Sequence, residues 1–347
     1  MAHIAFVVPR FHTNLFHATA ALLDAGHVVS VLATGAGSGE DHSRLTPILL
    51  GTTPEPGAVK ETLRRLKPDL LFIRTAADLS RQAAKVARQQ GLRAMRYDLL
   101  TLDGAPTAKQ RLLHWWRGLP GQRVTPVRTP GDRAERHGAA HFLPWPVTRW
   151  ADVAVTDAVL RQTPVPVLCV GKLGSPRKNH LPLIEALEAL GGGEVARLTL
   201  VGSLNRVNFA DGASYHDTLQ QAVDARDWIE MRAEVPYAEM PRLFADHAIC
   251  VLPSVDEPLG FAPVEGMAFG TIPVISAQSG SAGYLTGGTD GVIVDMQDPT
   301  ALRGGLEPLL HDAGTRRAMS AAARATAESE LSPKRFVERM EAILAAG

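Results

Sequence analysis

The stretch Val251–Ser276, VLPSVDEPLGFAPVEGMAFGTIPVIS, decides the fold of this chain. It opens within an apolar strand, turns at Pro253-Ser254, and continues as a small-residue helix over about Phe261–Phe269 and a second buried strand over Thr271–Ile275. Buried strands that alternate with helices indicate an open parallel sheet. Ligands of such sheets bind beyond the carboxyl ends of the strands, where helix N-termini offer free N–H groups.

Two glutamates of this stretch, Glu257 and Glu265, are separated by seven residues. The segment resembles the E-x7-E signature of retaining glycosyltransferases with the two-domain GT-B fold, most like family 4, the glycosyl transferases of group 1. The resemblance implies an α/β protein with two Rossmann-like domains facing each other across a cleft. It also implies that Glu257 lies by the donor sugar and that Glu265 holds the nucleotide ribose. The backbone amides at Gly260, Phe261 and Ala262 would then face the donor diphosphate.

A basic loop, GKLGSPRKN over residues 171–179, follows the predicted strand Val165–Val170. It resembles the family's G-R-x-x-x-K-(G/N) loop, in which an arginine and a lysine neutralise the donor diphosphate. The resemblance aligns Gly171 with the glycine, Lys172 with the arginine and Lys178 with the lysine of that motif. Lysine keeps the positive charge of the family's arginine but lacks its planar guanidinium group. Lys172 therefore cannot bind a phosphate through two parallel hydrogen bonds, as an arginine does.

Two further donor-side positions follow from the resemblance. Gly202, after the predicted strand Leu198–Val201, is similar to a glycine of the family's V-G-x-G turn, and Arg232 opens the turn that typically cups the nucleobase. The resemblance covers nearly all of residues 165–345, but over residues 1–140 it is only architectural. It implies a nucleotide-diphosphate sugar as donor substrate and no required cofactor.

The N-terminal half starts with a strand over His3–Val8, a helix over Thr13–Ala25 and a second strand, which is a βαβ pattern. Family members often carry a Gly-Gly loop between the first strand and the helix, and this chain lacks it. Arg10, His12 and Asn14 occupy that loop instead and are candidate acceptor contacts.

Charged residues also follow two later strands of this half. Arg74 comes directly after Asp69–Ile73, and Asp98 comes directly after Leu92–Tyr97. Arg74 is a candidate for binding a phosphate or an acceptor carboxylate, and Asp98 is a candidate base for the acceptor hydroxyl proton. A purely structural ion pair between Arg74 and Asp98 is an equally supported alternative.

A chain of 347 residues is long enough for two domains. We expect an acceptor-binding domain over residues 1–150, a nucleotide-sugar-binding domain over residues 151–330, and a C-terminal helix over residues 331–347. The GT-B resemblance implies that this last helix crosses back to the first domain. Residues 120–150 are rich in proline with little regular pattern, and the linker is expected between about Pro144 and Pro166.

The formal net charge is zero, but residues 60–136 hold an excess of about ten positive charges. In this region Lys109–Gly118, KQRLLHWWRG, mixes Trp115 and Trp116 with basic residues. Such a basic amphipathic piece could lie on an anionic membrane surface. The preferred alternative is a helix that packs its tryptophans on its own domain or on a partner subunit, because the segment is short.

Several classes of protein are excluded by what the sequence lacks. No apolar run approaches the roughly 20 residues of a membrane helix, and the first residues enter a strand without a secretory signal. Cys169 and Cys250 lie in apolar strands and indicate a reducing compartment. The expected location is therefore cytoplasmic, with peripheral contact at the inner membrane face as an alternative. Gly35–Gly39 follows the second strand rather than the first, which argues against a dinucleotide-binding oxidoreductase.

The sequence as a whole predicts a retaining, nucleotide-sugar-dependent glycosyltransferase. It contains no Asp-x-Asp, HExxH or CxxC pattern, so no metal site is expected, and the two loop lysines make a metal unnecessary. The acceptor is an unidentified small molecule, glycan or lipid, and no nucleic-acid partner is expected. Three alternatives remain: a sugar-nucleotide epimerase of the same fold, a catalytically weak GT-B protein that binds or regulates, and a nucleic-acid or membrane adaptor built on the basic segment.

Overall fold

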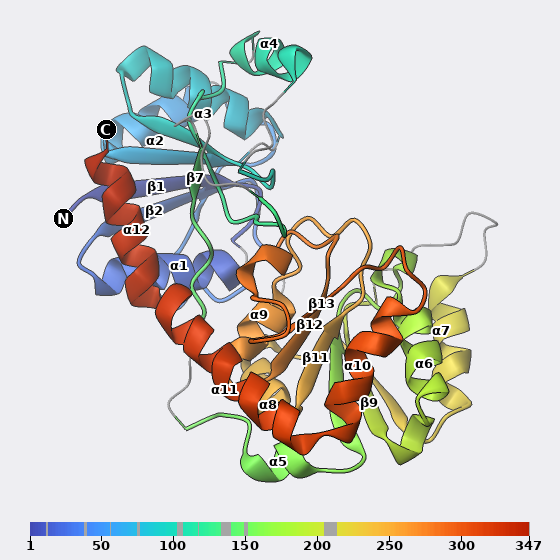
Figure 1. Cartoon of the computed structure of the whole chain (residues 1–347). Helices are drawn as coiled ribbons and strands as arrows, with labels where there is room; N and C mark the ends of the chain where they lie inside the picture. The colour runs from blue at the N-terminus through green and yellow to red at the C-terminus, as the bar shows by residue number, and fades with distance from the viewer. Residues whose placement is uncertain are drawn as a thin grey trace. The chain divides into compact units, whose positions relative to one another are not determined.

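The chain forms two parallel β-sheets, and helices connect most of the consecutive strands (Figure 1). The structure is a computed structural model that describes all residues except His12, 38–39, Pro56, 75–76, 103–106, Arg117, 133–139, 149–151, 205–213 and Gly347. For Thr13, Asn14, Ala77, Gln110 and Arg111 only the backbone is described. The expected α/β class with two Rossmann-like sheets is confirmed.

The first sheet, over the described residues, has the strand order β3-β2-β1-β4-β5-β6-β7, with every neighbouring pair parallel. Its strands are β1 (His3–Val8), β2 (Val28–Ala33), β3 (Ile48–Leu49), β4 (Leu70–Arg74), β5 (Ala94–Tyr97), β6 (Arg123–Thr125) and β7 (Ala140–Phe142). The helices packed with them are α1 (Thr13–Asp24), α2 (Ala58–Leu66), α3 (Ala77–Gln90), α4 (Ala108–Trp116) and α12 (Pro333–Ala345). Strands β1 and β4 are nearly continuous apolar runs, as expected where both faces of a parallel sheet are covered.

The second sheet has the order β10-β9-β8-β11-β12-β13 among the described residues, again all parallel. Its strands are β8 (Val165–Val170), β9 (Ala196–Gly202), β10 (Ile229–Ala233), β11 (Ile249–Leu252), β12 (Ile272–Ser276) and β13 (Val292–Val294). Its helices are α5 (Asp157–Arg161), α6 (His180–Ala189), α7 (Tyr215–Asp224), α8 (Met240–Ala245), α9 (Ala262–Met267), α10 (Ala301–His311) and α11 (Ala313–Glu330). Apolar side chains from β8, β9 and β11 pack with those of α6, α7 and α10 into one core.

The chain divides into two compact units. Unit 1 comprises Met1–Val127, Asp132–Pro146 and Leu331–Gly347, and unit 2 comprises Arg128–Gly131 and Val147–Glu330. Within unit 1, α12 packs against α1, and the Arg93 guanidinium donates to the carbonyl oxygens of Ile343 (2.7 Å) and Leu344 (2.8 Å) near the end of that helix. Those two carbonyls are free at a helix C-terminus, so a cation there is favourable.

Residues 120–150 are more regular than the sequence suggests. They contain the strands β6 and β7, which extend the first sheet and pair in parallel from Arg123↔Ala140 to Thr125↔Phe142. Each strand has only three residues, and prolines follow both within two positions. A period of two cannot be recognised over so short a run, so the sequence pattern missed both strands.

Helix α4 exposes its apolar side chains. Trp115 and Trp116 are each 75% exposed and Leu112 is 65% exposed, so the expected packing of the tryptophans on their own domain is wrong. The opposite face of the helix holds it to unit 1, because His114 Nδ1 lies 3.0 Å from Arg96 Nη1. Among the helices of the described residues, none has the length and apolar character needed to cross a membrane.

Candidate functional site

The candidate site lies where β8 and β11 run side by side at the centre of the second sheet. Cys169 of β8 pairs with Val251 of β11, so the loops that follow the two strands leave the sheet together. The strand order reverses here, because β9 and β10 lie on one side of β8 and β11 to β13 lie on the other. A reversal of this kind opens a crevice at the carboxyl ends of the strands, which is the usual ligand site of open α/β sheets.

Lys178 and Glu257 meet at this position. Lys178 Nζ lies 2.5 Å from Glu257 Oε2, and only 11% of each side chain is exposed. Arg177 contacts the same oxygen through Nη1 at 3.1 Å. The two residues that the sequence assigned to the donor diphosphate and the donor sugar are therefore in direct contact, across 79 positions of sequence.

Three predicted glycines allow the loops to approach closely. A Cβ on Gly202 would lie 1.5 Å from the carbonyl oxygen of Gly171, and a Cβ on Gly171 would lie 3.1 Å from Lys178 Cδ. Gly260 has φ +69°, and a Cβ there would lie 2.8 Å from Glu257 Cγ. A larger residue at Gly202 would push the loop after β8 away from the end of β9, so these glycines allow the close approach of the loops.

Glu265 lies in the first turn of α9, whose cap residue Phe261 makes no side-chain hydrogen bond to the first N–H groups. The Tyr237 hydroxyl donates to Glu265 Oε1 at 3.4 Å. Burial raises the pKa of Glu265 from 4.5 to about 7, although the hydrogen bond from Tyr237 opposes the shift. Burial also raises the pKa of Tyr237, so this hydroxyl stays protonated and able to donate.

The other two donor-side residues lie on neighbouring elements. Lys172 is exposed on the loop after β8, with its carbonyl accepting a hydrogen bond from the Ser175 N–H at 3.1 Å. Arg232 lies near the carboxyl end of β10, next to β9, and its Nη2 donates to Glu239 at 3.1 Å. Lys172 and Arg232 therefore lie, like Lys178, at the carboxyl ends of the strands of the second sheet.

The acceptor-side candidates lie in unit 1. Arg10 follows β1 and forms an ion pair with Glu40 at 2.9 Å, with 48% of its side chain exposed. Arg74 ends the neighbouring strand β4, and its guanidinium carbon lies 5.6 Å from the centre of the Tyr97 ring. His12 and the Asn14 side chain lie outside the described residues.

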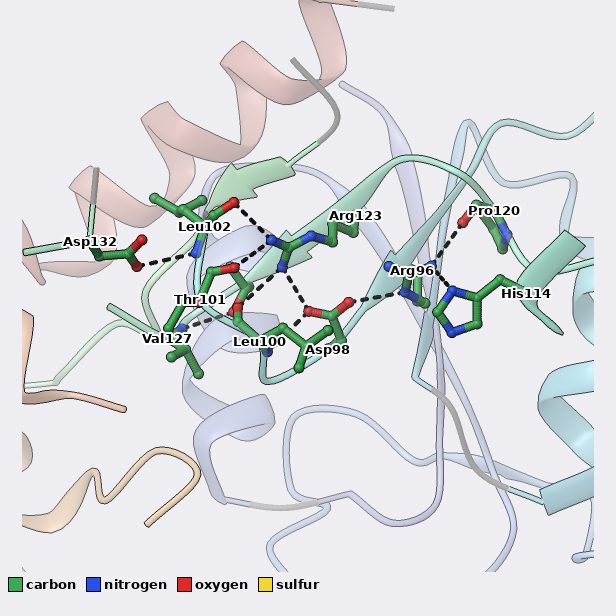
Figure 2. A network of polar contacts seen from close by, with 11 residues as sticks. Arg96, Asp98, Leu100, Thr101, Leu102, His114, Pro120, Arg123, Val127 and Asp132 are labelled. Atoms are coloured by element: carbon green, nitrogen blue, oxygen red, sulfur yellow. Dashed lines mark hydrogen bonds and ion pairs between the residues drawn. The ribbon is translucent and has the colours of Figure 1, made fainter. Parts of the chain in front are cut away.

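Asp98 lies between two buried arginines (Figure 2). Arg96 Nε contacts Asp98 Oδ2 and Arg123 Nη1 contacts Asp98 Oδ1, both at 3.0 Å, and all three side chains are at most 10% exposed. The sequence alternative paired Asp98 with Arg74, whereas these ion pairs come from Arg96 and Arg123. Arg123 also donates to the carbonyl oxygens of residues 100–102, so the network fixes the loop after β5.

Sequence reasoning missed two residues of the donor-side site. Arg177 precedes Lys178 in the basic loop, and its charge was the only signal available. Tyr237 lies 28 positions before Glu265, and nothing in its sequence neighbourhood indicates the contact. Among the residues that the structure describes, no three His, Cys, Asp or Glu side chains gather as they would around a metal ion.

The two parallel α/β sheets define a protein of the GT-B class. Residues 157–326 match the family model described as glycosyl transferases group 1. We therefore assign the chain to the GT-B group 1 glycosyltransferases, and the second unit carries the family match.

Relatives and solved structures agree with this assignment. A GDP-mannose-dependent monoacylated alpha-(1-6)-phosphatidylinositol monomannoside mannosyltransferase of Corynebacterium glutamicum is 32% identical over 240 residues, which cover 67% of this chain and 55% of that protein. The chain spans about half the length of this curated relative.

Two solved structures resemble the whole chain. Sucrose-phosphate synthase from Thermosynechococcus elongatus has a TM-score of 0.73 at 18% identity, and Anabaena HepE in complex with UDP and glucose has a TM-score of 0.75 at 14% identity. Both alignments cover 100% of each chain. At these identities the resemblance shows the fold.

Proposed function

We propose that this protein is a retaining glycosyltransferase that binds a nucleotide-diphosphate sugar in unit 2 and transfers the sugar to an acceptor held by unit 1. One observation supports it above the others: Lys178 and Glu257 form a buried ion pair where β8 and β11 end. An ammonium group and a carboxylate side by side suit a ligand that carries pyrophosphate next to sugar hydroxyls.

In this proposal each side chain has one task in the transfer. Lys178 and the exposed Lys172 receive the negative charge that builds on the pyrophosphate as its bond to the anomeric carbon breaks, which stabilises the transition state. Glu257 accepts hydrogen bonds from the donor sugar and orients it. Glu265 holds the ribose hydroxyls. Retention of configuration follows from the E-x7-E resemblance, and the loop cations supply the countercharge that a metal ion supplies in other transferases.

Unit 1 would bind the acceptor through Arg10 and Arg74 at the carboxyl ends of β1 and β4, which also lie side by side. Arg10, paired with Glu40, can exchange that carboxylate for an anionic acceptor group. Asp98 instead supports the first sheet, because both of its oxygens are already engaged by buried guanidinium groups.

The tryptophans of α4 favour an acceptor presented at a membrane surface. Leu112, Trp115 and Trp116 lie three and four positions apart, so they share one face of the helix, and all are exposed. The Arg88 side chain of α3 lies next to Gly118, just beyond the helix, and adds positive charge there. An apolar helix face beside basic side chains fits the interface of an anionic bilayer.

Membrane contact is tested by vesicle flotation. The protein should float with phosphatidylglycerol vesicles and much less with phosphatidylcholine vesicles, and the double substitution Trp115→Ala and Trp116→Ala should abolish flotation. Leu49→Ala removes another exposed apolar residue of unit 1, on β3, and should float like the wild type. Equal flotation of the tryptophan variant and the wild type would assign the exposed face to a protein partner instead.

The donor site is tested by thermal melting with a panel of nucleoside diphosphates and their sugars. A ligand that binds the folded state raises its melting temperature by mass action. The panel should include GDP-mannose and UDP-glucose, since the mannosyltransferase relative is named for GDP-mannose and HepE was solved with UDP and UDP-glucose. Lys178→Ala and Glu265→Gln should each abolish the shift while the unliganded variants stay folded. A full response of both variants would refute the site assignment.

Binding alone does not distinguish a transferase from a binding protein. With a glycan or lipid acceptor present, an enzyme releases free nucleoside diphosphate from the donor, and Lys178→Ala should reduce that release. A protein that binds the sugar nucleotide but never releases the diphosphate would be the binding or regulatory form of this fold.

A further inference from the structure

The two loops of the donor site are joined by their own hydrogen bonds. The Val255 N–H donates to the Arg177 carbonyl at 3.0 Å, and Asn179 Nδ2 donates to the Pro253 carbonyl at 2.9 Å. These bonds hold the basic loop after β8 against the turn after β11. The side chains of Arg177, Lys178 and Glu257 therefore meet because the backbone brings them together.

Both cations converge on a single carboxylate oxygen. Glu257 Oε2 lies 2.5 Å from Lys178 Nζ and 3.1 Å from Arg177 Nη1, and the same Nη1 donates to the Asp256 carbonyl at 2.8 Å. Arg177 is the more open of the two cations, with 36% of its side chain exposed against 11% for Lys178. The cluster of three side chains carries one formal positive charge.

We infer that Glu257 is the internal counter-ion of the pyrophosphate-binding cations, and that donor binding exchanges this carboxylate for the pyrophosphate; the inference rests on the function proposed above. The cations cannot keep the carboxylate and also bind an anion closely, since the two anions would then repel each other at short range. Pyrophosphate offers several oxygens to the cations, whereas Glu257 offers them one. When pyrophosphate enters, the carboxylate must turn to another partner.

The sugar of the donor supplies that partner. Sugar hydroxyls can donate hydrogen bonds to the displaced carboxylate, and such charge-assisted bonds are strong. A nucleoside diphosphate without its sugar must displace Glu257 and leaves it with no new donor. The cluster would thus favour the intact donor over the diphosphate product and assist product release after transfer.

Arg177 becomes a diphosphate-binding residue in this exchange. The family motif has an arginine at the position of Lys172, and a lysine there loses the planar fork that binds phosphate through two bonds. Arg177 has the fork, is partly exposed, and is held beside Lys178 by the loop contacts. It supplies the guanidinium that Lys172 does not.

The test compares free diphosphates with intact donors by titration calorimetry, using GDP, UDP, GDP-mannose and UDP-glucose as probes. Glu257→Gln keeps the size of the side chain but removes the charge that competes with pyrophosphate. It should tighten binding of the free diphosphate by about tenfold and weaken binding of the intact donor, so that the preference for the donor is lost. Unchanged or weaker binding of the diphosphate by Glu257→Gln would overturn the inference.

A second variant tests the role of the guanidinium independently. Arg177→Gln should weaken diphosphate binding by about tenfold, and Arg177→Lys should restore part of it by returning the charge. Arg197→Gln is the matched control, because Arg197 is exposed on β9 at the opposite end of the same sheet. Equal diphosphate affinity in Arg177→Gln and the control would overturn the assignment of Arg177.

Different outcomes would overturn the proposed function and the exchange at Glu257. A wild-type protein that binds no member of the panel of nucleoside diphosphates and their sugars would overturn both the proposed function and the exchange. A wild type that binds donor and diphosphate normally, with a Glu257→Gln variant that leaves their ratio unchanged, would overturn the exchange alone. Melting of each unliganded variant at the wild-type temperature would establish that the changes in affinity are local.

Discussion

Replacing Glu265 by glutamine should stabilise the protein at alkaline pH while it impairs donor binding. Burial raises the pKa of this carboxyl from 4.5 to about 7. Because the folded pKa lies above the unfolded value, the unfolded chain releases this proton first, and stability falls as pH rises from about 4.5 through about 7. At roughly 1.4 kcal/mol per pKa unit, the loss is about 3 kcal/mol once the group is ionised in the folded state.

Glutamine removes the ionisation but keeps the acceptor for the Tyr237 hydroxyl. The variant and the wild type should therefore melt at similar temperatures near pH 5. At pH 8.5 the variant should melt higher by roughly 6 to 12 °C, taking about 2 to 4 °C per kcal/mol for a unit of this size. The gain in stability accompanies a loss of function, as is common where a site holds a strained or buried charge.

The assay is a series of melting curves from pH 5 to pH 8.5 without ligand. Glu185→Gln is the matched control, because it makes the same substitution at an exposed position of α6 in the same unit. If Glu265→Gln and the wild type differ by the same amount at both ends of the range, then burial does not disfavour the ionised carboxylate and the reasoning is refuted.

Three further predictions concern the framework of the two units. Asp98→Asn should destabilise unit 1 by about 3 to 5 kcal/mol, because it leaves two buried guanidinium groups without their carboxylate. Chemical unfolding measures this change, and an unchanged unfolding midpoint would contradict the role of Asp98 in supporting the first sheet. Gly202→Ala should lower the melting temperature and abolish donor binding, since the added Cβ would overlap the carbonyl oxygen of Gly171. Gly35→Ala is the control and should be neutral, because its Cβ would have open space. Equal melting temperatures of the two variants would count against the close approach of the loops at Gly202. Cys169 and Cys250 should react with a thiol reagent only after unfolding, because both are buried and burial raises their pKa values; rapid labelling of the native protein would contradict this.

The exposed face of α4 shows where a local pattern stops being informative. Trp115 and Trp116 sit in a helix that the sequence indicated, yet the sequence favoured burying them. Tryptophan is usually well buried, so composition alone predicts packing. Exposure depends instead on which face of the helix meets the rest of the unit, and His114 on the opposite face contacts Arg96.

The sequence by itself determined most of the elements and their order, apart from the short strands β6 and β7. Apolar runs of four to seven residues, separated by helical segments, gave the α/β class, and the spacing of Glu257 and Glu265 with the basic loop gave the family resemblance. Burial periodicity and turn residues act over a few positions, so they can be read along the chain.

Tertiary structure alone decided which of these groups meet. Strand order put β8 next to β11, and this adjacency brought Lys178 and Arg177 onto one oxygen of Glu257. The pairing of β5 with β6 likewise brought Arg123 to Asp98, which lies two positions from Arg96 in the sequence. Parallel strands pair across long crossovers, so the partner of a strand-end residue depends on the topology of the whole sheet rather than on its neighbours in sequence.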